Sequence, residues 1–196
     1  MAYPYSDPKV DFAHRKKSYA DLSLPDPGTT KVFDPNFSVK MPSCDGLDLD
    51  SIAQKDFNCY SECPLRSCDS LQKGADGCYY LVEFKNQASG NINRDEIHKK
   101  IIDSLSLILY AFSPNDSIRS LYKWVKAYVV FPDQNAFLKI VKTVATSGST
   151  QTTMPLARPL WGLDELVKHE FIGYVDTMPL SDFQKEVTTW PKMVLP

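Results

Sequence analysis

The chain lacks most of the short motifs that identify an enzyme from its sequence. Its three histidines, His14, His98 and His169, stand far apart, which argues against a histidine metal site and against a Cys-His nucleophile pair. The sequence has no glycine-rich phosphate loop, no Gly-x-Ser-x-Gly motif and no internal repeat. These absences disfavour P-loop nucleotide hydrolysis, serine-hydrolase chemistry and repeat architectures.

Long apolar runs and a strong net charge are also missing. The most apolar stretch, residues 107–112, is far shorter than the roughly 20 residues that span a membrane. The N-terminus lacks the basic start and apolar run of a signal peptide, so we expect a cytoplasmic protein with no membrane association. The net charge of −2 gives no global attraction to nucleic acid, and any phosphate binding therefore has to be local.

The cysteines do not predict a disulfide framework. They number five, and an odd number in a cytoplasmic protein is typical of reduced thiols. Cys59, Cys63, Cys68 and Cys78 lie close together, but a structural zinc site usually offers two tight pairs and only the first two of these are tightly spaced. A cysteine-bound metal is therefore a minor alternative, and Cys68 and Cys78 are interpreted as small apolar residues of a hairpin.

A β-hairpin is the clearest structural signal that the sequence does contain. Residues 79–84 are aromatic and β-branched, which predicts a strand, and residues 65–72 are expected to form its partner. The intervening Gly-Ala-Asp-Gly is typical of a turn. If the loop has three residues with Gly77 in the left-handed conformation, Gly74 pairs with Cys78 and the register of the whole hairpin follows.

This register brings charged residues together on one face of the hairpin. It sets Asp69 opposite Glu83, and because side chains alternate along a strand, Lys85 lies on the same face roughly 6.5 Å further along. Tyr80 and its alternate neighbours face a core on the other side. Two carboxylates beside a lysine suit Mg²⁺ or Mn²⁺ and an activated water, and the backbone carbonyl of Phe84 could complete the metal site. The alternative is a set of ordinary surface charges with Lys85 paired to Glu83.

The next elements predict a parallel strand pair. Asn93 and Glu96 resemble a capping box, and apolar residues at helical spacing follow until Pro114 ends the helix. Residues 124–131 are then expected to form a strand, and residues 127–131 within it are continuously apolar, as expected where both faces are covered. A strand, a helix and a strand in this order imply a right-handed crossover within one sheet.

The length of 196 residues is typical of one domain with extensions. We expect an irregular, proline-rich N-terminal arm over residues 1–43, an α/β core over residues 44–145 and a C-terminal extension packed on the core over residues 146–196. Apolar residues at 137, 140, 141 and 144 predict a further helix, which a polar linker over 146–153 ends.

The residues around the hairpin resemble the PD-(D/E)XK nuclease superfamily. Val-Glu-Phe-Lys-Asn at 82–86 is similar to its Glu-x-Lys signature, and Asp69 takes the place of its upstream acid, although Cys68 stands where the family name has proline. The resemblance covers residues 48–131. It implies a restriction-endonuclease-like αβββαβ core with a central mixed sheet flanked by helices. It also implies that Asp69 and Glu83 hold the metal and that Lys85 orients or polarises the attacking water.

The resemblance leaves other parts of such a site open. The family often adds an acid from its first helix, and Gln87 could also line the site; the competing acids are Asp48, Asp50, Asp56 and Glu62. Nucleic-acid contacts are predicted from basic residues beside the site, on the polar side of the long helix and near the following strand: Lys99, Lys100, Arg119, Lys123 and Lys126.

Two functions follow from these features. The first is a metal-dependent nuclease that hydrolyses phosphodiester bonds in DNA or RNA. The second is a catalytically inactive module of the same fold that binds nucleic acid or a protein partner, of the antitoxin, immunity or phage accessory type. In that case the tail aromatics Trp161, Tyr174 and Trp190 could form an interface. Many nucleases of this kind act as homodimers or in larger assemblies.

Overall fold

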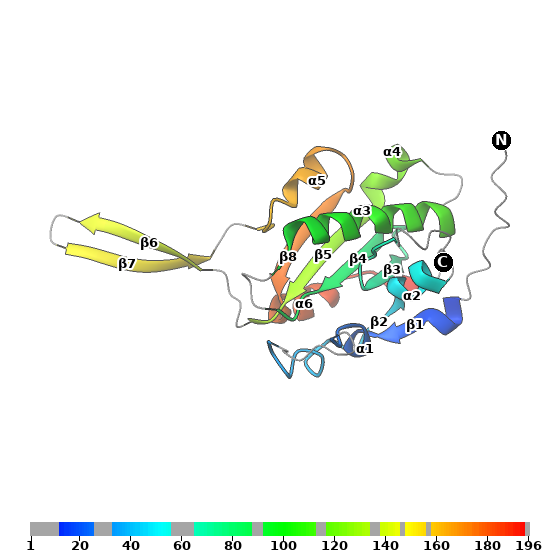
Figure 1. Ribbon diagram of the computed structural model, residues 1–196, viewed down its shortest axis with the longest axis horizontal. Coiled ribbons are helices and arrows are strands. Elements are labelled where there is room, and N and C mark those ends of the chain that lie inside the picture. Colours follow the sequence, from blue (N-terminus) through cyan, green and yellow to red (C-terminus); the bar gives the residue numbers. More distant parts are fainter. Residues whose placement is uncertain are drawn as a thin grey trace.

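The computed structural model describes most of the chain, with gaps at both termini and between several elements. The described residues are 12–25, 33–55, 65–87, 92–112, 117–133, 138–145, 148–155 and 158–194. Within these ranges the protein is an α/β fold in which helices flank a mixed sheet (Figure 1). None of the helices in these ranges is both long and apolar enough to cross a membrane.

The central sheet runs in the strand order β1-β2-β3-β4-β5-β8, and the short β9 pairs with the last two residues of β3. Pairing is antiparallel from β1 to β4 and parallel from β4 through β5 to β8. The strands are β1 (Lys16–Ser18), β2 (Asp45–Asp48), β3 (Ser70–Gly74), β4 (Tyr79–Phe84), β5 (Val125–Phe131), β8 (Tyr174–Pro179) and β9 (Met193–Val194).

The β3–β4 hairpin has the predicted turn and register. The N–H of Gly74 donates to the carbonyl of Cys78 at 2.8 Å, and Gly77 has a φ of +83°, which glycine adopts without strain. The carboxylate of Asp76 accepts from the N–H of Cys78 at 3.0 Å and supports the loop. The ladder places Ser70 opposite Val82.

The partner strand begins later than the sequence predicts, at residue 70 and not at residue 65. Two backbone N–H groups of the preceding segment donate to side chains of α3 (Arg94–Ala111). Arg66 donates to Asp103 and Cys68 donates to Ser104, at 3.0 and 2.9 Å. This segment therefore crosses the helix before the strand begins.

The predicted crossover is present. Asn93 caps α3 by accepting from two N–H groups of its first turn, and β5 pairs in parallel with β4 so that Glu83 lies beside Val129. The other helices are α1 (Tyr19–Leu22), α2 (Leu49–Lys55), α4 (Ile118–Leu121), α5 (Asp164–Lys168) and α6 (Leu180–Val187). One 3-10 turn (Phe12–Arg15) precedes β1, and another (Tyr122–Trp124) follows α4.

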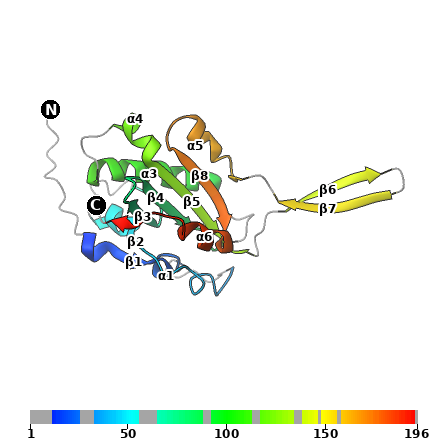
Figure 2. The same ribbon diagram turned by 180° about the vertical axis from the view of Figure 1, so that it is seen from behind.

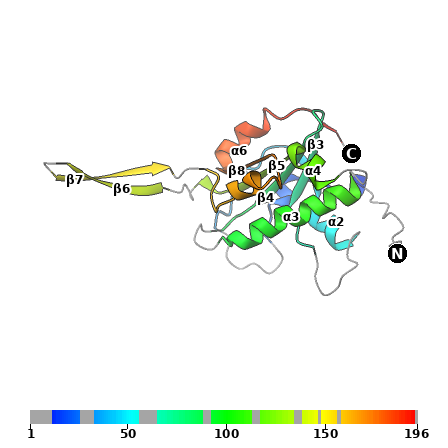
Figure 3. The same cartoon turned by 90° about the horizontal axis from the view of Figure 1, so that it is seen from above.

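The two faces of the sheet carry separate cores. Residues of α2, α3 and α5 pack on one face with Leu81 of β4, and residues of α1 and α6 pack on the other with Tyr80, Val82 and Phe84. Figure 3 shows α3 and α6 on opposite sides of the strands. The predicted division of β4 into two faces is therefore correct, and each face is covered by helices.

The prediction of a helix after β5 is wrong. Residues 138–145 and 148–155 form the strands β6 (Leu138–Ala145) and β7 (Gly148–Pro155) of an antiparallel hairpin, where we expected a helix and a linker. The apolar residues fit helical spacing, but Ile140, Val141 and Val144 are β-branched and favour strands. Figures 1 and 2 show this hairpin projecting away from the sheet.

The sheet includes parts of both predicted extensions. Before residue 43, β1 pairs with β2, and Tyr19 and Phe37 are fully buried. After residue 146, β8 pairs with β5, and β9 pairs with β3. The basic side chains of the first strand form ion pairs within the sheet: Lys16 with Asp45 at 2.9 Å and Lys17 with Asp48 at 2.6 Å.

Candidate functional site

Two carboxylates meet at the open end of the β3–β4 hairpin, opposite its turn. Asp69 directly precedes β3, and the register extends from the Ser70–Val82 pair to bring it opposite Glu83. The N–H of Phe84 donates to Oδ2 of Asp69 at 2.6 Å, which holds this carboxylate against the end of β4. The Glu83 side chain is only 1% exposed. A buried carboxylate needs charged or hydrogen-bonding partners, and two lysines supply them.

Two ammonium groups flank Glu83. Nζ of Lys85 lies 2.8 Å from Oε1 of Glu83 and 3.3 Å from Oε1 of Glu96. Nζ of Lys100 lies 2.9 Å from the same Glu83 oxygen and 3.4 Å from Oδ1 of Asp69. The residues Asp69, Glu83, Lys85 and Lys100 are called the hairpin cluster below. Lys100 thus contacts both carboxylates.

The position of Lys100 corrects a sequence prediction. We expected it on the polar side of α3 with Lys99, but its ammonium group contacts Glu83 of the sheet. Ser104, one turn further along, is fully buried; its hydroxyl donates to the carbonyl of Lys100 and accepts from the N–H of Cys68. The sequence signal for this arrangement is Ser104 itself. A serine among the apolar residues of α3 indicates that this face of the helix contacts polar groups.

Helix α2 brings a third carboxylate towards the cluster. Asp50 lies in the first turn of this helix, and the hydroxyl of Ser67 donates to its Oδ1 at 2.5 Å. Lys100 and Glu83 both act electrostatically on Asp50, attracting and repelling its charge respectively. Of the acids that competed for the place of a helix-borne carboxylate, Asp50 is therefore the one with this arrangement among the described residues.

The other candidates for an additional site residue differ from Asp50. Asp48 is buried, accepts from an N–H in the first turn of α2 and forms an ion pair with Lys17, so its carboxylate stabilises the helix start. Gln87 is exposed in the loop after β4. Asp56 and Glu62 lie outside the described residues.

The electrostatics of the site follow from its burial. Burial and the nearby Glu83 charge raise the pKa of Asp69 well above its usual value, and burial raises that of Asp50. Burial alone would lower the pKa of Lys100, but the carboxylates of Glu83 and Asp69 outweigh it and raise this pKa. Burial would likewise lower the pKa of Lys85, but the Glu83 carboxylate outweighs burial and raises this pKa. Both lysines are therefore cations at neutral pH.

The donor atoms of the site suit a hard divalent cation. Mg²⁺ is commonly held by one or two carboxylates together with waters and substrate phosphates, and Asp69 and Glu83 supply two. No cluster of three or more Asp, Glu, His or Cys side chains arranged for a metal occurs within the described ranges. Asp69 and Glu83 would hold such a cation, and the Lys100 ammonium group contacts the same two carboxylates. Phe84 contributes its N–H to the site, and metal binding by its carbonyl stays a prediction.

The basic residues predicted to contact nucleic acid do not form one wall beside Glu83. Lys99 is exposed on α3, and Lys123 is exposed just before β5. Lys126 belongs to the other face of the sheet, where its Nζ lies 3.2 Å from the hydroxyl of Tyr80. Because β5 begins beside Tyr79, the start of this strand lies four residues, or ~13 Å, from the level of Glu83.

Cys68 and Cys78 are buried thiols, whereas Cys44 is half-buried. Cys68 is 1% exposed, and burial raises its pKa well above the usual value; Cys78 is also buried, and burial raises its pKa too. These properties agree with the interpretation of both as small apolar residues. Cys59 and Cys63 lie outside the described residues.

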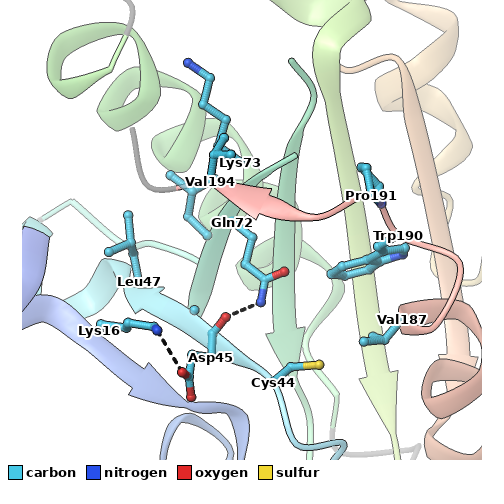
Figure 4. Close-up of a pocket in the computed structure, with 12 residues that line it drawn as sticks. Lys16, Cys44, Asp45, Leu47, Gln72, Lys73, Val187, Trp190, Pro191 and Val194 are labelled. Atoms are coloured by element: carbon cyan, nitrogen blue, oxygen red, sulfur yellow. Dashed lines mark hydrogen bonds and ion pairs between the residues drawn. The ribbon is translucent and has the colours of Figure 1, made fainter. Parts of the chain in front are cut away.

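A cavity of about 350 Å³ lies on the opposite face of the sheet from the hairpin cluster. Figure 4 shows Trp190 and Val187 on one side of it and Asp45, Gln72 and Lys16 on the other. Lys16 and Asp45 neutralise each other within its wall. No residue of the hairpin cluster lines this cavity, so its volume does not locate the candidate chemistry.

Comparison with known protein families, with curated proteins and with solved structures gives no match. The resemblance to the PD-(D/E)XK superfamily therefore stays a prediction from the residues around the hairpin.

Proposed function

We propose that this protein is a metal-dependent phosphodiesterase of the PD-(D/E)XK type that hydrolyses DNA or RNA. The observation that carries the proposal is the opposition of Asp69 and Glu83, with the Lys85 ammonium group 2.8 Å from Glu83. Two carboxylates and a lysine at the end of one hairpin are the groups that this chemistry requires.

The order of elements supports the proposal in part. Strands β2, β3 and β4 form an antiparallel series, and α3 then leads to the parallel β5. This resembles the ββαβ portion of the αβββαβ core. Helix α2 lies between the first and second strands of the series and not before it, which is a departure from the expected order.

Each residue of the site has a role in this proposal. Asp69 and Glu83 hold the cation, and Asp50 adds negative charge from α2. A bound Mg²⁺ or Mn²⁺ lowers the pKa of a water ligand and stabilises charge on the phosphate. Lys85 has a raised pKa and stays protonated, so it orients the water or stabilises the phosphate as a cation and does not act as the base. The N–H of Phe84 fixes the Asp69 carboxylate.

The test is cleavage of plasmid, single-stranded DNA and RNA by the purified protein, with Mg²⁺, with Mn²⁺ and with chelator. We expect metal-dependent cleavage that falls by about 10²–10³ in Lys85→Ala, the usual loss when one preorganised charge is removed from a transition state. Lys185→Ala removes an exposed lysine on the other face of the sheet and serves as the matched control. An inactive wild-type protein, or full activity in Lys85→Ala, would contradict the proposal.

One observation favours the second candidate function, a non-catalytic binding module. The Lys100 ammonium group already contacts both carboxylates, and Glu83 is nearly inaccessible, so the cluster is balanced without a metal. If the cluster is only structural, Mg²⁺ will not raise the melting temperature of the protein. A metal that binds the folded state alone raises it with concentration, which separates the two functions independently of cleavage.

A further inference from the structure

The β6–β7 hairpin differs in charge from the rest of the chain. From residue 134 to residue 163 the sequence has no Asp or Glu, although the whole chain has 24 of them. The same thirty residues contain Lys139, Lys142 and Arg158. The hairpin itself is also rich in hydroxyl and amide residues: Thr143, Ser149, Thr150, Gln151, Thr152 and Thr153. Lysine, serine, threonine and glutamine are the side chains that commonly contact nucleic-acid phosphates.

The hairpin leaves the sheet close to the candidate active site. It is inserted after β5, which ends at Phe131, and β5 runs parallel to β4, which ends at Phe84. The N–H of Lys85 donates to the carbonyl of Val130 at 2.8 Å, so the two strands end at the same edge. Glu83 lies at this edge, and Figure 1 shows the hairpin extending outward from the same end of β5.

The dimensions of the hairpin fit duplex DNA. Each strand has eight residues, which corresponds to ~27 Å and therefore to about eight base pairs. A two-stranded β-ribbon fits the major groove of B-DNA, whereas the major groove of A-form RNA is deep and narrow. By register, Lys139 lies opposite Met154 and Lys142 opposite Gln151, which places one lysine on each face of the ribbon.

We propose that the β6–β7 hairpin is an arm that binds duplex DNA beside the hairpin cluster, with Lys139 and Lys142 contacting phosphates. This inference rests on the proposed nuclease function, because it names the substrate of the same site as duplex DNA. The locally basic arm supplies the phosphate attraction that a chain of net charge −2 does not provide as a whole.

The test measures binding without cleavage. Anisotropy of a labelled DNA duplex, titrated with the full-length protein in chelator over a range of salt concentrations, gives the slope of log K against log salt. Each phosphate contact contributes about −0.9 to this slope, so Lys139→Ala/Lys142→Ala should make it shallower by about 1.8. Lys185→Ala/Lys192→Ala removes two exposed lysines of the C-terminal part and should leave the slope unchanged. Thermal unfolding checks that both double variants are folded.

Several outcomes would contradict the proposal that the β6–β7 hairpin binds duplex DNA. These are a wild-type protein that does not bind duplex DNA, a double variant with the wild-type slope, and tighter binding of duplex RNA through the same lysines. A change in oligomeric state of the double variant with an unchanged slope would make the hairpin a protein interface. Binding that needs the two lysines without any cleavage supports the arm while the nuclease proposal fails. Cleavage that needs Lys85 with binding independent of the arm gives the reverse result.

Discussion

The two β-hairpins of this chain have the same topology and opposite surroundings. β3 and β4 lie inside the sheet, where β2 and β5 pair with their outer edges and helices cover both faces. β6 and β7 pair with each other in a separate two-stranded sheet. Burial fixes the register of the first hairpin, because a slip by one residue would move every side chain to the wrong face. That is why the first hairpin can hold charged atoms in fixed contact.

The first hairpin shows how a sheet can bury charge. All six residues of β4 are buried, and the alternation that places Tyr80 and Val82 in one core places Leu81 and Glu83 in the other. Glu83 is tolerated there because Lys85 and Lys100 both lie within 2.9 Å of it. The stability of this hairpin and its candidate chemistry therefore depend on the same ion pairs.

The largest effect that we predict is for Glu83→Ala. The substitution leaves two buried ammonium groups without their main partner, and breaking a buried pair in this way costs about 3–5 kcal/mol of the free energy of unfolding. Urea unfolding in metal-free buffer measures it.

The matched control is Glu165→Ala, which breaks an ion pair of similar length, 2.7 Å, between exposed side chains on α5. Here we expect no measurable change, because solvent screens exposed pairs. Equal effects of the two substitutions would show that the hairpin cluster is not a buried ion network, and the contrast between the two hairpins would lose its basis.

A pair of valines compares the hairpins directly. Val82 of β4 is fully buried, and Val82→Ala should lower the free energy of unfolding by about 2 kcal/mol. Val141 of β6 belongs to the projecting hairpin, and Val141→Ala should change the stability of the whole protein by less than about 0.5 kcal/mol. Chemical denaturation of both variants gives the difference. A large loss from Val141→Ala would mean that the second hairpin is part of the cooperative core.

Local signals explain what the sequence predicted correctly. The register of the first hairpin followed from a glycine at the position that needs a positive φ, and the crossover followed from the cap at Asn93 and the apolar strand after it. The second hairpin was mistaken for a helix because its apolar residues recur at intervals of three and four. The strict alternation that identifies a strand with one buried face is missing from residues 138–145.

The candidate site was predicted only in part, for a physical reason. Asp69, Glu83 and Lys85 are close because one turn and one register place them, so their arrangement is visible in a short segment. Lys100 comes from α3, and its position depends on how that helix rotates and packs on the sheet. Asp50 comes from α2, and its carboxylate accepts a hydrogen bond from Ser67 in the segment that precedes β3. Contacts between elements of this kind leave little trace in local sequence patterns.

The smallest effect that we predict in the first hairpin concerns its turn. Gly77 has a φ of +83°, and a Cβ there would meet no atom within 4 Å, so Gly77→Ala isolates the conformational cost, about 1–2 kcal/mol. Gly77→Asn should cost less, since asparagine tolerates the left-handed region. Thermal unfolding measures both. Because β2 and β5 also hold β3 and β4, Asp69 should stay opposite Glu83 and metal-dependent cleavage should persist in Gly77→Ala wherever the variant is folded. Loss of cleavage in a folded Gly77→Ala protein would show that the turn, and not the neighbouring strands, sets the register of the site.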